Sequence, residues 1–84
     1  MKGKKLLSKL LSGSKNIRFA EAVSCAELFG FKLTRVRGSH HVFTHPRVSE
    51  LINLQNVQGK AKSYQVKQLL KIIESYDLRM EDEE

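Results

Sequence analysis

The chain has one cysteine, one proline, no tryptophan and no long hydrophobic run. The single cysteine, Cys25, excludes an internal disulfide and favours a reducing compartment, so we expect a cytoplasmic protein. The longest apolar stretches span a few residues, against the roughly 20 that a membrane-spanning helix needs. No secretory signal is expected, because Lys9 interrupts the leucines of Met1–Leu11 and no small-residue cleavage site follows them.

Acidic residues are scarce in most of the chain. Residues 1–76 contain 14 Lys and Arg against four Asp and Glu, a net charge of +10, whereas residues 81–84 are all acidic. A body this basic favours a polyanionic partner, either nucleic acid or an anionic membrane surface. At 84 residues we expect one small domain, 1–84, with an accessory helix and linker at 1–15, a core at 16–76 and an acidic tail at 77–84.

Hydrophobic spacing predicts an α+β fold. Leu6, Leu7, Leu10 and Leu11 predict a short amino-terminal helix, and helical spacing recurs over 19–29, with Asn16 as a cap and Gly30 as a stop, and over 66–76, with Ser63 as a cap. Between them, β-branched residues and turns predict three antiparallel strands at 32–37, 40–45 and 50–55, followed by a basic loop at 58–62. Helices should cover one face of this sheet and leave the other free to meet a ligand.

All three histidines, His40, His41 and His45, lie in one predicted hairpin. Alternation along a strand puts His41 and His45 on one face about 13 Å apart and His40 on the other, which weighs against a shared metal ion. Cys25 falls at the edge of a helical apolar stripe, where a half-buried thiol is ordinary. The sequence therefore predicts no metal and no cofactor.

The remaining chemical interpretation of the histidine cluster is acid-base catalysis by a histidine on a phosphodiester. RNA suits it best, because its 2′-hydroxyl is a built-in nucleophile. Gly38 allows close backbone approach to a phosphate, Ser39 can donate to a phosphate oxygen, and nearby cations can hold neighbouring phosphates; these are Arg37, Lys60 and Lys62. The same cations are equally typical of a solvated rim.

A specific pattern carries a family resemblance. Gly30-Phe31, Leu33, Arg37-Gly38-Ser39-His40-His41-Val42-Phe43 and His45-Pro46, followed by a strand, a lysine-rich loop and a helix, resemble the HicA (YcfA-like) toxins of bacterial toxin-antitoxin systems over residues 19–76. The resemblance implies a double-stranded-RNA-binding-domain-like fold, metal-independent cleavage of mRNA by a type II toxin, and a HicB-like antitoxin partner. It also implies that His40 is catalytic. His41, which alternation puts on the other face of the sheet, is then a flanking residue that packs or contacts RNA.

The chain departs from that family in two respects. Many relatives carry a further histidine after the third strand, where this chain reads Leu51–Asn56, so catalysis would depend on His40 alone. The segments 1–15 and 81–84 lie outside the usual toxin pattern. Two alternatives stay open: a non-catalytic RNA-binding module of the same fold, and a protein whose basic surface and leucine-rich helix face dock on a partner.

Overall fold

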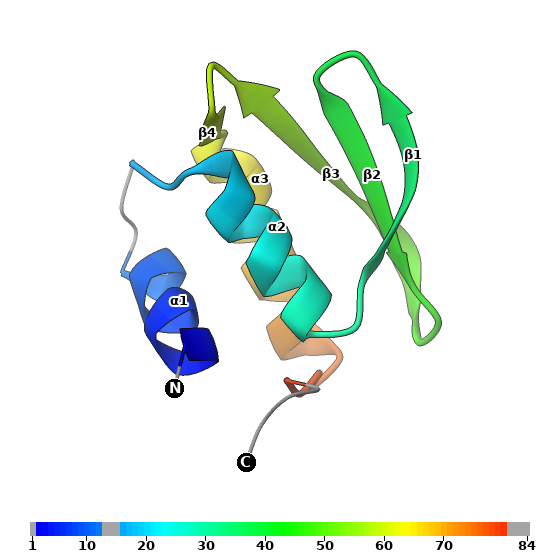
Figure 1. The fold of residues 1–84 in the computed structure, drawn as a ribbon. Coiled ribbons are helices and arrows are strands. Elements are labelled where there is room, and N and C mark those ends of the chain that lie inside the picture. The colour runs from blue at the N-terminus through cyan, green and yellow to red at the C-terminus, as the bar shows by residue number, and fades with distance from the viewer. Residues whose placement is uncertain (1, 13–15, 81–84) are drawn as a thin grey trace.

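The structure, a computed structural model, describes residues 2–12 and 16–80, so the linker 13–15 and the acidic run 81–84 lie outside it. Side chains of the first helix are described from Leu7 onward. The elements follow in the order α1 (Lys2–Leu11), α2 (Phe19–Leu28), β1 (Lys32–Arg37), β2 (His40–His45), β3 (Val48–Val57), β4 (Lys60–Ala61) and α3 (Ser63–Ser75) (Figure 1).

The predicted α+β class, with a double-stranded-RNA-binding-domain-like arrangement, is confirmed. The described strands form one antiparallel sheet in the order β1-β2-β3-β4, with the helices gathered on one side of it (Figure 1). The expectation of three strands was wrong by one, since two residues of the predicted basic loop form β4 beside Asn56 and Val57. Gln58 and Gly59 both have positive φ, 53° and 86°, and this pair reverses the chain as a type I′ hairpin turn does.

The core lies between the sheet and the helices. Ala22 and Ala26 are fully buried one turn apart, so α2 presents small side chains on its inner face. The sheet contributes alternate residues, among them Phe43, Ile52 and Leu54. α3 contributes Val66, Leu69, Ile72 and Ile73. The other face of the sheet carries none of these core side chains.

Two predicted helix caps are wrong. α2 begins with Arg18 at the N-cap and α3 with Lys62, not with Asn16 and Ser63. Arginine and lysine have no side-chain acceptor, and neither residue makes a side-chain cap hydrogen bond. Arg18 forms a β-bridge with Lys60, and its N–H donates to the Glu21 carboxylate at 2.9 Å. The predicted stop at Gly30 is confirmed by its φ of 93°.

The amino-terminal helix α1 packs on α2 and α3. Leu10 is only 2% exposed, so the face that was a candidate for partner docking largely completes this chain's own core, although Leu11 is 63% exposed. The Lys9 ammonium lies 2.9 Å from the Glu21 carboxylate and ties α1 to the first turn of α2. Hydrogen bonds from Lys9 and from the Arg18 backbone lower the pKa of Glu21 below its ordinary value.

Candidate functional site

His40 is the first residue of β2 and follows a tight hairpin turn. Gly38 has a φ of 59°, while Ser39 does not share this positive φ, which is the pattern of a type II′ turn with glycine at its first position. Arg37 pairs with His40 directly across this turn, and His40 pairs with Gln55 of β3. The turn therefore fixes the position from which the His40 side chain projects from the sheet.

The register shows which side chains share a face with His40. Residues paired directly across antiparallel strands project from the same side of the sheet, so Arg37, His40 and Gln55 share the face turned away from the helices. The next row of this face holds Arg35, Val42 and Asn53. The His40 side chain is exposed there, and its Nδ1 lies 3.1 Å from Nδ2 of Asn53. Within the described ranges, its Nε2 has no hydrogen-bond partner.

His41 and His45 point to the helix side, as strand alternation predicted. The ring of His41 packs against Phe19, with centroids 4.6 Å apart, and its Nδ1 lies 3.1 Å from the Ser39 carbonyl oxygen. Since a carbonyl only accepts, Nδ1 carries the proton in this contact. His45 instead accepts at Nδ1 from the Arg47 N–H at 3.0 Å, and its ring meets Phe31 at 5.1 Å. The three histidines therefore have three different sets of partners.

No group of three or more His, Cys, Asp or Glu side chains within residues 7–12 and 16–80 is arranged to hold a metal ion. Cys25 offers no nucleophile either. It is buried, and desolvation raises the pKa of its thiol to about 11, so it stays protonated at neutral pH.

Several predicted site residues meet at one end of the sheet. The Asn56 N–H donates to the Ser39 carbonyl at 2.9 Å, which places the β1–β2 turn beside the end of β3. There the chain turns into β4, and the Gly59 carbonyl accepts from the Phe19 N–H at 2.9 Å. The N-terminus of α2 therefore lies at the same end, and α3 begins two residues after β4 (Figure 1).

This end of the molecule, which we call the basic end, carries positive charge of two kinds. Arg37, Lys60 and Lys62 make no ion pair with any residue of the described ranges. Lys62 Nζ instead lies 5.9 Å from the centre of the Tyr64 ring. The N-termini of α2 and α3 add the partial positive charge of the helix dipole, which the Glu21 carboxylate offsets at α2, where it accepts from the Arg18 N–H. The basic end can accordingly hold phosphate.

Sequence reasoning missed two parts of this arrangement. Arg35 lies one row from Arg37 on the face of His40, and Asn53 contacts the His40 ring. Arg35 shares the face of Arg37 because the two are alternate residues of β1, whereas the Asn53 contact depends on how β3 is registered against β2. Alternation counted along one strand does not contain that information.

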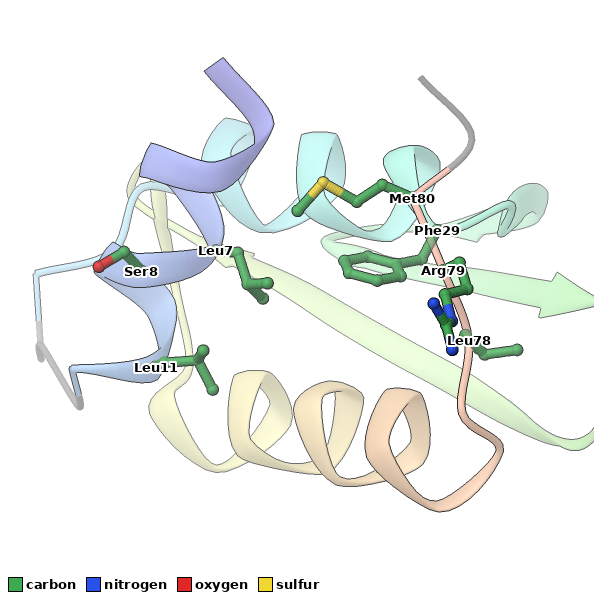
Figure 2. A pocket seen from close by; sticks show the side chains of 7 residues that line it. All are labelled: Leu7, Ser8, Leu11, Phe29, Leu78, Arg79 and Met80. Atoms are coloured by element: carbon green, nitrogen blue, oxygen red, sulfur yellow. The ribbon is translucent and has the colours of Figure 1, made fainter. Parts of the chain in front are cut away.

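A hollow lined mainly by apolar side chains lies elsewhere on the molecule. Figure 2 shows it between Leu7 and Leu11 of α1, Phe29, and the segment Leu78–Met80. Phe29 follows the C-terminal end of α2, whereas His41 contacts Phe19 at its N-terminal end. The hollow therefore does not belong to the basic end.

The fold and this end define a small, basic α+β domain of the double-stranded-RNA-binding-domain type. A family model described as the HicA toxin of bacterial toxin-antitoxin systems matches residues 19–74, which is 56 of the 84 residues. The chain belongs to the HicA toxin family. Its role is that of the toxin in a toxin-antitoxin system, where it acts with an antitoxin partner. No curated protein matches the chain. In the described ranges no helix is long and apolar enough to span a membrane.

Proposed function

We propose that this toxin is an endoribonuclease that cleaves mRNA without a metal ion and uses His40 as its proton-transfer residue. The observation that carries the proposal is the position of His40: exposed, next to the basic end, with Nε2 open to a substrate. The 2′-hydroxyl of RNA supplies the nucleophile, so a domain this small needs to supply only proton transfer and charge neutralisation.

The reaction follows from that geometry. His40 Nε2 takes the 2′-hydroxyl proton as the 2′-oxygen attacks the adjacent phosphorus. The bond from phosphorus to the 5′-oxygen then breaks, which leaves a 2′,3′-cyclic phosphate on one fragment and a 5′-hydroxyl on the other. The departing 5′-oxygen takes its proton from water, because His41 points to the opposite side of the sheet.

The predicted binding residues have separable roles in this reaction. Arg37 shares the face of His40 and holds the phosphate at the cleaved bond, while Gly38 and Ser39 let the backbone of the turn approach it. Lys60 and Lys62 hold phosphates further along the RNA strand, beside the N-termini of α2 and α3. His41 stabilises the turn from the helix side of the sheet through its contact with the Ser39 carbonyl.

The same surface is also the proposed binding site of the antitoxin. A HicB-like protein with acidic side chains would neutralise the basic end and cover His40, which stops cleavage without any change in the fold of the toxin. A substrate that is mRNA also implies action in the cytoplasm.

The test is cleavage of a short synthetic RNA in the presence of a chelator. We expect fragments that end in cyclic phosphate, and His40→Ala should lower the rate by about 10²- to 10⁴-fold with RNA affinity nearly unchanged. His41→Ala is the matched control and should lose less. Binding without fragments would establish the alternative, a non-catalytic RNA-binding module. Tenfold loss on chelation, restored by one metal, would contradict the metal-free mechanism.

A further inference from the structure

Asn53 combines two features that a purely structural strand residue would not need. Asparagine is disfavoured in strands relative to β-branched residues, yet it occupies an inner position of β3, opposite Val42. Its Oδ1 is also buried without a hydrogen-bond partner in the described part of the chain. An unpaired buried oxygen costs free energy, and valine or threonine at this position would avoid that cost.

The contact that Asn53 does make is with the His40 ring. Its amide lies 3.1 Å from Nδ1, so this nitrogen faces the sheet and Nε2 faces outward. A histidine that exchanges protons with a substrate needs one nitrogen turned to that substrate and the other held, because the held nitrogen sets both tautomer and ring orientation. The amide of Asn53 is placed to do this.

We propose that Asn53 is the positioning residue of His40, a step that rests on the proposed ribonuclease function. When Nδ2–H donates to Nδ1, the ring proton is on Nε2 and faces a phosphate oxygen. When the amide turns by half a rotation, Oδ1 accepts from Nδ1–H, and Nε2 becomes the base that takes the 2′-hydroxyl proton. In the base-competent tautomer Oδ1 thus gains a partner, while the Nδ2 amino group takes the buried position that Oδ1 leaves.

Three variants of the full chain separate this role from support of the sheet. Asn53→Val removes both the amide oxygen and the amide nitrogen and suits a strand, so kcat for RNA cleavage should fall by about 10- to 100-fold with KM unchanged, the size of effect found when the second nitrogen of a metal-ligating histidine loses its partner. Asn53→Asp keeps an acceptor for Nδ1–H and should retain most of the activity. Leu51→Val, an exposed position two residues earlier on β3, is the control and should leave kcat unchanged.

The ring itself provides a measurement that does not depend on cleavage. In ¹⁵N NMR spectra, the ring nitrogen signals of His40 should shift between the wild type and Asn53→Val, whereas those of His41 and His45 should stay in place. Unchanged His40 signals, or equal loss of kcat in the valine and aspartate variants, would overturn the proposal. If the wild type cleaves no RNA, the proposed function fails, and the ring signals still decide whether Asn53 holds His40.

Discussion

Gln65 offers a sharp test of how the basic end is held together. It is the second residue after the start of α3, and it is 3% exposed. Its Oε1 accepts from the Gln55 N–H at 2.7 Å. β4 pairs only with Asn56 and Val57, so the outer edge of β3 has no strand neighbour at Gln55. The Gln65 side chain supplies the acceptor that a neighbouring strand would otherwise provide.

The substitution Gln65→Leu keeps the size of the side chain and removes the acceptor. Leaving the Gln55 N–H unpaired costs about 1–3 kcal/mol, and the added apolar burial of leucine offsets roughly 1 kcal/mol of it. We therefore expect a net loss of about 0–2 kcal/mol in the free energy of unfolding, centred on about 1 kcal/mol. For a domain of this size, a loss of about 1 kcal/mol, the middle of that range, lowers Tm by about 4–8 °C.

Thermal unfolding followed by circular dichroism measures the loss, and amide hydrogen exchange locates it. Gln68→Leu makes the same chemical change three residues later on the exposed side of α3 and serves as the control. The Gln55 amide should exchange faster in Gln65→Leu only. Since Gln55 pairs with His40, RNA cleavage should fall as well. Equal Tm values for the two variants, with the Gln55 amide still protected, would refute the reasoning.

Two further predictions concern charge. Because the pKa of Glu21 is lowered in the folded state, its contribution is present above its ordinary value of 4.5 and is lost as the pH falls through the folded value. Glu21→Gln should therefore lower stability by about 0.5 kcal/mol at pH 7 and by progressively less below pH 4.5, with Glu27→Gln as control in urea titrations. Lys60→Gln should reduce the slope of log affinity against log salt for single-stranded RNA by about 0.7, and Lys71→Gln should not. Equal slopes would remove Lys60 from the interface.

The strands next to the candidate site could be predicted from the sequence because their pattern is local. The bounds 32–37 and 40–45 agree with β1 and β2, since glycine and serine mark the turn and β-branched residues flank it. The opposite orientation of His40 and His41 also follows from alternation within one strand, and the contacts with Asn53 and Phe19 agree with it. The family pattern lies in the same segment.

The partners of the site could not be predicted, because they are set by register. Asn53 is 13 residues from His40, and Gln65 is 10 residues from Gln55. A slip of β3 by one residue would exchange its two faces and remove both contacts. The sequence also failed to predict β4. Glutamine at 58 is not a typical residue for a positive φ, so only Gly59 marks the two-residue turn before this strand.

The placement of the histidines also predicts the shape of the pH profile. The ring of His41 packs against Phe19 on the helix side, so within the described residues His40 has no second histidine on its own face of the sheet. With His40 as the only base and water as the proton donor, the pH profile of RNA cleavage should have a single limb that rises toward alkaline pH and then stays level. kcat/KM measured across the pH range in a chelating buffer tests this. A bell-shaped profile would mean that a second group donates a proton, and its loss in a His41 variant would identify that group as His41.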